Sequence, residues 1–105
     1  MSYQKLVRDQ IPQIIRQNGK KPIVRILEDE EYTACLHQKL DEEVAEFHQD
    51  RNVEELADIL EVVLALAADL GISREMLEAA YNQKHQQRGG FADRLLLVSV
   101  EDKCL

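Results

Sequence analysis

Residues 39–60, KLDEEVAEFHQDRNVEELADIL, carry the pattern from which the fold of this chain is predicted. It contains two pairs of acidic residues, Glu43 with Glu46 and Glu55 with Asp58, and the members of each pair are three positions apart. On a helix, this spacing projects both carboxylates from one face, a turn apart. A helical projection places Glu43 and Glu55 inside apolar stripes, with Glu46 and Asp58 at the margins. The stretch therefore predicts two helices whose carboxylates converge.

Four carboxylates among apolar side chains need a partner. An unpaired buried carboxylate costs several kcal/mol, or shifts its pKa until it is neutral. No His or Cys accompanies the acids on these faces, and such oxygen donors suit Mg²⁺, with Mn²⁺ as an alternative, rather than zinc. The pattern predicts that Glu43, Glu46, Glu55 and Asp58 bind metal for a phosphorylated substrate. One of them, or Glu42, would orient or deprotonate the attacking water.

Working outward, the sequence predicts a single all-α domain over residues 1–105, a helical bundle subunit with three major helices and a short N-terminal helix. A minor two-stranded element is expected from the β-branched runs PIVRIL and LLLVSV. The expected helices span residues 11–18 with Asp9 as cap, 29–49 with Asp29 as cap, 52–70 with Asn52 as cap, and 73 to about 89 with Ser73 as cap.

Composition limits the function classes. The chain has a formal net charge of −7 and 5% aromatic residues, which argues against a nucleic-acid polymer as partner. The N-terminus lacks the apolar region of a signal peptide and no apolar run reaches membrane-spanning length, so a cytoplasmic protein without membrane contact is expected. Cys35 and Cys104 are expected to be reduced thiols rather than a disulfide or a zinc site.

Basic residues occur where a polyphosphate would need them. The candidates for phosphate binding are Lys39, Lys84, Arg88, Lys5 and Arg8. Lys39 precedes Glu43 by one turn, whereas Lys84 and Arg88 end the last helix on an apolar side. Two alternatives stay open: Lys84 and Arg88 as snorkelling residues at a helix C-terminus, and Lys5 and Arg8 as exposed residues, with Asp9 as a partner.

The predicted helix at residues 52–70 has an apolar arc wider than half its circumference. One neighbouring helix does not cover such an arc, so we expect a homodimer or a tetramer.

Three segments carry a family resemblance: KLVRDQIPQII at residues 5–15, EELADILEVVLALA at 54–67 and RGGFADRLLL at 88–97. Together they resemble the all-α nucleoside triphosphate pyrophosphohydrolases, which include MazG, dimeric dUTPases and phosphoribosyl-ATP pyrophosphohydrolases, and above all the small MazG-like members. The resemblance implies helical subunits in dimers or tetramers and Mg²⁺-dependent cleavage between the α and β phosphates. It places Glu43, Glu46, Glu55 and Asp58 at the metal positions, and Lys84 and Arg88 at the basic positions.

The resulting hypothesis is a nucleotide pyrophosphohydrolase that converts a nucleoside triphosphate to the monophosphate and pyrophosphate, with removal of non-standard nucleotides as a suggested role. Two rivals remain. One is a phosphoribosyl-ATP pyrophosphohydrolase, and the other is a non-catalytic helical dimer that binds a nucleotide or a protein. Loss of turnover in a carboxylate variant would separate an enzyme from a binding protein.

Overall fold

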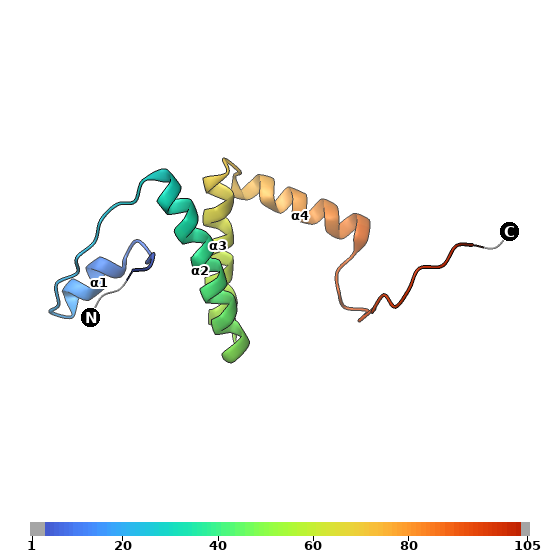
Figure 1. The fold of residues 1–105 in the computed structure, drawn as a ribbon, viewed down its shortest axis with the longest axis horizontal. Coiled ribbons are helices and arrows are strands. Elements are labelled where there is room, and N and C mark those ends of the chain that lie inside the picture. The colour runs from blue at the N-terminus through green and yellow to red at the C-terminus, as the bar shows by residue number, and fades with distance from the viewer. Residues whose placement is uncertain (1–3, 104–105) are drawn as a thin grey trace. The chain divides into compact units, whose positions relative to one another are not determined.

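The computed structural model describes residues 4–103, which form four α-helices and no strand (Figure 1). The helices are α1 (Ile11–Gln17), α2 (Asp29–Gln49), α3 (Val53–Asp69) and α4 (Arg74–Arg88). The predicted all-α class, with a short helix followed by three longer ones, is confirmed. The chain divides into two compact units, Met1–Arg74 and Glu75–Leu105. The first unit contains the packed pair α2 and α3.

Helices α2 and α3 form an antiparallel hairpin, lying side by side in Figure 1. A short connection joins them, since α2 ends at Gln49 and α3 begins at Val53. At the open end of the hairpin, the Thr33 hydroxyl donates a hydrogen bond of 2.6 Å to the Asp69 carboxylate. This bond ties the start of α2 to the end of α3, and the connection ties the opposite ends.

The ends of α3 are fixed by local chemistry. At its start the Asn52 side chain accepts a hydrogen bond of 2.9 Å from the backbone N–H of Glu55, as the predicted cap requires. At its end Gly71 adopts a φ of 78°, a conformation that favours glycine. The N–H groups of Gly71 and Ile72 then bond back to Ala68 and Ala67 in a Schellman motif. The helix bearing Glu55 and Asp58 is therefore capped at both ends.

The core of the hairpin is small. Only Leu36, Val62 and Ala67 are buried apolar residues among those described. Several large apolar side chains of α3 stay exposed, namely Val53, Leu56 and Leu60, as does its C-cap Leu70. The wide apolar arc inferred for this helix is thus present and only partly covered by α2, while the expected oligomer stays a prediction.

The minor two-stranded element is wrong for the described residues. Neither residues 22–27 nor residues 95–100 form a strand, and most of their side chains are exposed. β-branched residues favour a strand only where a neighbouring strand offers backbone partners and a packed face, so composition alone overstated the preference.

Two predicted caps are also displaced by one position. Gln10, not Asp9, is the N-cap of α1, because a turn closed by Ile11 N–H to Arg8 C=O places Asp9 before the cap. Glu28 is the N-cap of α2, and Asp29 is its first helical residue. There the Asp29 carboxylate still lies at the positive end of the helix dipole.

Two further expectations concern the membrane and the thiols. Within residues 4–103, no helix combines the length and the apolar character needed to cross a bilayer. Cys35 is half-buried and free, and Cys104 lies outside the described residues.

Candidate metal site on the hairpin of α2 and α3

The hairpin brings the two predicted acidic pairs together. Glu43 and Glu46 lie near the end of α2, and Glu55 and Asp58 lie near the start of α3, so all four flank the short connection. One carboxylate oxygen from each residue lies within 4.8 Å of the others. Oxygens on opposite sides of a single Mg²⁺ are about 4.2 Å apart, given its bond length of about 2.1 Å. The cluster is therefore close to the size that one such ion requires.

The burial of the four acids follows the helical projection. Glu43 is buried, with 6% of its surface exposed, while Glu55 and Asp58 are half-buried and Glu46 is exposed. Oxygens Oε2 of Glu43 and of Glu55 are buried and accept no hydrogen bond. A buried carboxylate oxygen without a donor is costly, and its presence on both helices at one point is typical of a site that can hold a cation. With carboxylates as the only donors, a hard cation such as Mg²⁺ fits the site.

Two of the four groups have a raised pKa. The pKa of Glu46 is raised first by hydrogen bonding with the neighbouring Glu43 carboxylate and then by the negative charge of Glu43. The pKa of Glu55 is raised first by desolvation and then by the negative charge of Asp58. Both shifts have the direction expected when like charges share a site.

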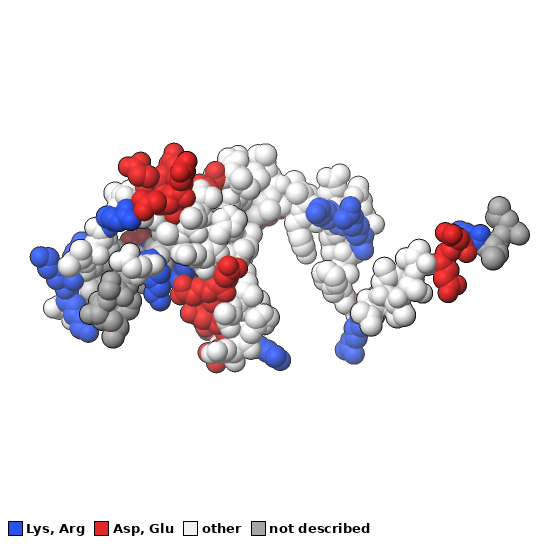
Figure 2. Space-filling model, in the orientation of Figure 1, with Lys and Arg blue, Asp and Glu red and all other residues white. Residues whose placement is uncertain are grey.

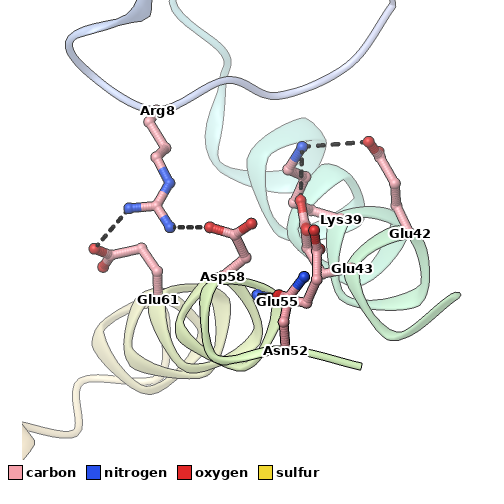
Figure 3. A network of polar contacts seen from close by, with 8 residues as sticks. All are labelled: Arg8, Lys39, Glu42, Glu43, Asn52, Glu55, Asp58 and Glu61. Atoms are coloured by element: carbon pink, nitrogen blue, oxygen red, sulfur yellow. Dashed lines mark hydrogen bonds and ion pairs between the residues drawn. The ribbon is translucent and has the colours of Figure 1, made fainter. Parts of the chain in front are cut away.

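Lys39 supplies one positive charge from within α2. Its ammonium lies 3.1 Å from Glu43 Oε1 and 3.4 Å from Glu42 Oε1, and its side chain is largely buried (Figure 3). Burial alone would lower the pKa of Lys39, but the bond to Glu43 and the charges of both acids outweigh burial and raise it. The prediction that Lys39 lies beside the carboxylates is confirmed. Glu42 is half-exposed and holds this lysine.

Arg8 reaches the same site from the non-helical segment before α1. Its guanidinium donates a hydrogen bond of 2.6 Å to Asp58 Oδ1 and lies 3.5 Å from Glu61 Oε1 (Figure 3). The expectation that pairs Arg8 with Asp9 is therefore replaced by pairing with Asp58 and Glu61. Lys5 lies 3.4 Å from Glu42.

Glu61 was not among the residues that the sequence predicts for the site. It remains exposed, yet it pairs with Arg8. Its position three residues after Asp58 was the available signal, because that spacing places both carboxylates on one face of the helix.

A cavity of about 450 Å³ adjoins the carboxylates. It lies between residues 6–14 and the hairpin, and its polar lining includes Arg8, Lys39, Glu43 and Asp58. Its apolar lining includes Tyr32, Leu36 and Val62. The volume falls within the range of small-molecule sites, which are mostly apolar with a few convergent polar groups.

The remaining predicted basic residues lie in the second unit. Lys84 and Arg88 are exposed residues on the last turns of α4. Figure 2 shows acidic side chains gathered at the end of the hairpin where α2 meets α3. A role for Lys84 and Arg88 at that acidic surface stays a prediction.

Comparison with known proteins places the chain in a family. Residues 6–89 match the model of a family described as dUTPase, a span that includes the four clustered acids, Arg8 and Lys39. The chain belongs to this dUTPase family. The family assignment agrees with the resemblance to the all-α nucleotide pyrophosphohydrolases at the level of a dUTPase-like helical protein.

One curated relative shows a local match. An uncharacterised protein of Mycolicibacterium smegmatis is 61% identical over 41 residues, which are 39% of this chain. The match covers 42% of that protein, so the chain spans about two fifths of the length of the relative. No solved structure matches the chain significantly.

Proposed function

We propose that the protein is a Mg²⁺-dependent nucleoside triphosphate pyrophosphohydrolase of the small MazG-like type. The observation that carries the proposal is the convergence of four carboxylates within 4.8 Å, two of them with buried oxygens that accept no hydrogen bond. Membership of a dUTPase family makes a nucleotide the expected substrate class, and dUTP the first compound to test.

In the proposed reaction, water attacks the α-phosphorus and the bond from this atom to the oxygen bridging to the β-phosphorus breaks. The products are a nucleoside monophosphate and pyrophosphate. Bound Mg²⁺ would supply charge neutralisation of the phosphoryl oxygens and a lowered pKa for water. The residues that would hold it are Glu43, Glu46, Glu55 and Asp58.

The chain's own side chains divide the other tasks. Glu42, or one of the four clustered carboxylates, would accept the proton of the attacking water. Lys39 holds Glu42 and Glu43 in place through contacts of 3.4 Å and 3.1 Å. Arg8 and Lys5, together with Lys84 and Arg88 of α4, are the candidates that neutralise the polyphosphate.

The cavity beside the cluster suits the nucleoside part of such a substrate. Its carboxylate side would face the phosphates, and its apolar side, with Tyr32, would face the sugar and base. The exposed apolar face of α3 supports assembly into a dimer or tetramer, in which a second copy covers Leu56 and Leu60.

The test is product analysis with dUTP, the canonical nucleoside triphosphates, modified triphosphates and phosphoribosyl-ATP, each with Mg²⁺ and with EDTA. We expect monophosphate and pyrophosphate from at least one nucleoside triphosphate, and no products in EDTA. In ¹⁸O-labelled water, the label should enter the monophosphate, because attack is at the α-phosphorus.

Other outcomes would replace the proposal. Turnover of phosphoribosyl-ATP alone would make the protein a phosphoribosyl-ATP pyrophosphohydrolase. Binding of Mg²⁺ and nucleotide without turnover across the panel would make it a non-catalytic binding protein. Release of inorganic phosphate would mean cleavage at the terminal phosphate and would contradict the proposed reaction.

A further inference from the structure

Arg8 and a metal ion would use the same carboxylate. Asp58 is one of the four acids in the cluster, and it also receives the 2.6 Å hydrogen bond from Arg8. A guanidinium at this distance neutralises Asp58 while no cation is bound. It would also repel an incoming divalent cation, because like charges a few ångströms apart interact appreciably even in a solvated site.

A second acceptor for Arg8 lies outside the cluster. Glu61 Oε1 is 3.5 Å from the other terminal nitrogen of the guanidinium, Nη1. Glu61 follows Asp58 by three residues on α3 and is exposed. Arg8 can therefore leave Asp58 without losing every anionic partner.

Lys39 and Arg8 differ in their freedom to move aside. Lys39 belongs to the same helix as Glu43, four residues earlier, and its side chain is only 18% exposed. The Arg8 side chain is 51% exposed and belongs to a non-helical segment, residues 4–10. Burial and helix geometry hold Lys39 in place, whereas neither constrains Arg8.

We propose that Arg8 is a metal-gated positioning residue. In the metal-free protein it neutralises Asp58, and when a divalent cation occupies the cluster it passes to Glu61 and to the polyphosphate of the substrate. The segment at residues 4–10 then responds to the metal before any chemistry occurs. This inference rests on the metal site of the proposed function.

The first test is Mn²⁺ affinity, measured by electron paramagnetic resonance at fixed ionic strength, for the wild type, Arg8→Gln and Arg25→Gln. Arg25 is a matched control, because it makes a two-point ion pair with Glu31 on the same unit but contacts no member of the cluster. We expect Arg8→Gln to bind Mn²⁺ about three- to tenfold more tightly than the wild type, and Arg25→Gln to match the wild type. Unchanged or weaker binding by Arg8→Gln would overturn the inference, since it would make Arg8 a bystander or a support for Asp58.

The second test needs no variant with altered folding. The Arg8 Nε–Hε resonance of the wild type labelled with ¹³C and ¹⁵N, assigned with Arg8→Lys, is followed during Mg²⁺ titration. We expect it to shift with the same dissociation constant as the carboxylate signals of Asp58. A shift at Asp58 with a stationary Arg8 resonance would overturn the inference and leave the metal site intact. Absence of any metal binding to the wild type would overturn both this inference and the metal dependence of the proposed function.

Discussion

The two acidic pairs of the site obtain their positive charge in different ways. Glu43 on α2 is paired with Lys39, one turn earlier in the same helix, at 3.1 Å. Asp58 on α3 is paired with Arg8, which lies 50 positions earlier in the chain. The first pairing follows from helical spacing, whereas the second depends on how the N-terminal segment packs against the hairpin. The site therefore takes one positively charged side chain, Lys39, from α2 itself and another, Arg8, from a segment outside the hairpin.

The largest expected effect is a loss of nucleotide turnover, and it comes from removing a carboxylate that belongs to neither ion pair. Glu55→Gln keeps the size of the side chain and its capped backbone N–H, but it removes one charge from the cluster. We predict a loss of nucleotide turnover of at least about a hundredfold, because even outer-sphere changes at metal sites cost 10- to 100-fold. Steady-state rates with the best substrate of the panel provide the measurement.

The control for this change is Glu54→Gln. Glu54 lies in the same first turn of α3 and is exposed, and it does not belong to the cluster. Its variant should retain turnover within about twofold, as expected for a surface charge. Equal losses in the two variants would show that charge near the helix start matters, rather than the cluster.

The next prediction compares the stability lost when the largely buried Lys39 is replaced with that lost when the exposed Lys5 is replaced. Lys39→Met leaves Glu43 with a largely buried, unpaired carboxylate, so we expect the free energy of unfolding in metal-free buffer to fall by about 2 kcal/mol. This is below the range for fully buried pairs, because the Lys39 side chain keeps 18% exposure. Lys5→Met removes a charge whose side chain is 51% exposed and should cost less than about 1 kcal/mol. Urea denaturation of both variants makes the comparison, and equal losses would contradict the distinction.

A smaller effect is expected at the start of α3. Asn52→Ala removes the acceptor for Glu55 N–H and should lower the free energy of unfolding by about 1 kcal/mol. Asn52→Asp retains the acceptor and adds negative charge at a helix N-terminus, so it should preserve stability. If the alanine variant also lost metal affinity while the aspartate variant did not, the cap would be shown to position Glu55. Full metal affinity in both variants would mean that the cap contributes to stability and does not position Glu55 for metal binding.

Much of the hairpin could be predicted from sequence, because its determinants are local. The spacing of Glu43 with Glu46 and of Glu55 with Asp58 located the cluster, and Asn52 marked the start of α3. Contacts between residues far apart in the chain have no comparable local pattern in the sequence. The contact of Arg8 with Asp58 and Glu61 was missed for that reason.

The absence of strands at residues 22–27 and 95–100 has a related origin. A strand exists only with a partner, and a β-branched run does not say whether one is present. Local spacing thus predicted the part of the site that belongs to α2 and α3. It did not predict the pairing of Arg8 or the absence of strands, because both depend on contacts between distant segments.

The proposal that the carboxylate cluster of the hairpin binds a cation is tested by measuring the free energy of unfolding against pH for the wild type and Glu55→Gln. The pKa of Glu55 is raised above its ordinary value, so its protonated form is favoured in the folded state. The stability associated with that proton is fully present below the unfolded pKa of about 4.5 and is lost as pH rises through the raised pKa. In metal-free buffer, Glu55→Gln should therefore be more stable than the wild type at pH 7, with a difference that shrinks toward pH 4.5.

Mg²⁺ should reverse the order at pH 7, because the cation stabilises only the protein that retains the full set of ligands. The free energy of unfolding, measured with and without Mg²⁺, gives the decisive comparison. A Glu55→Gln variant that is less stable than the wild type without metal, or a wild type that Mg²⁺ leaves unchanged, would contradict the claim.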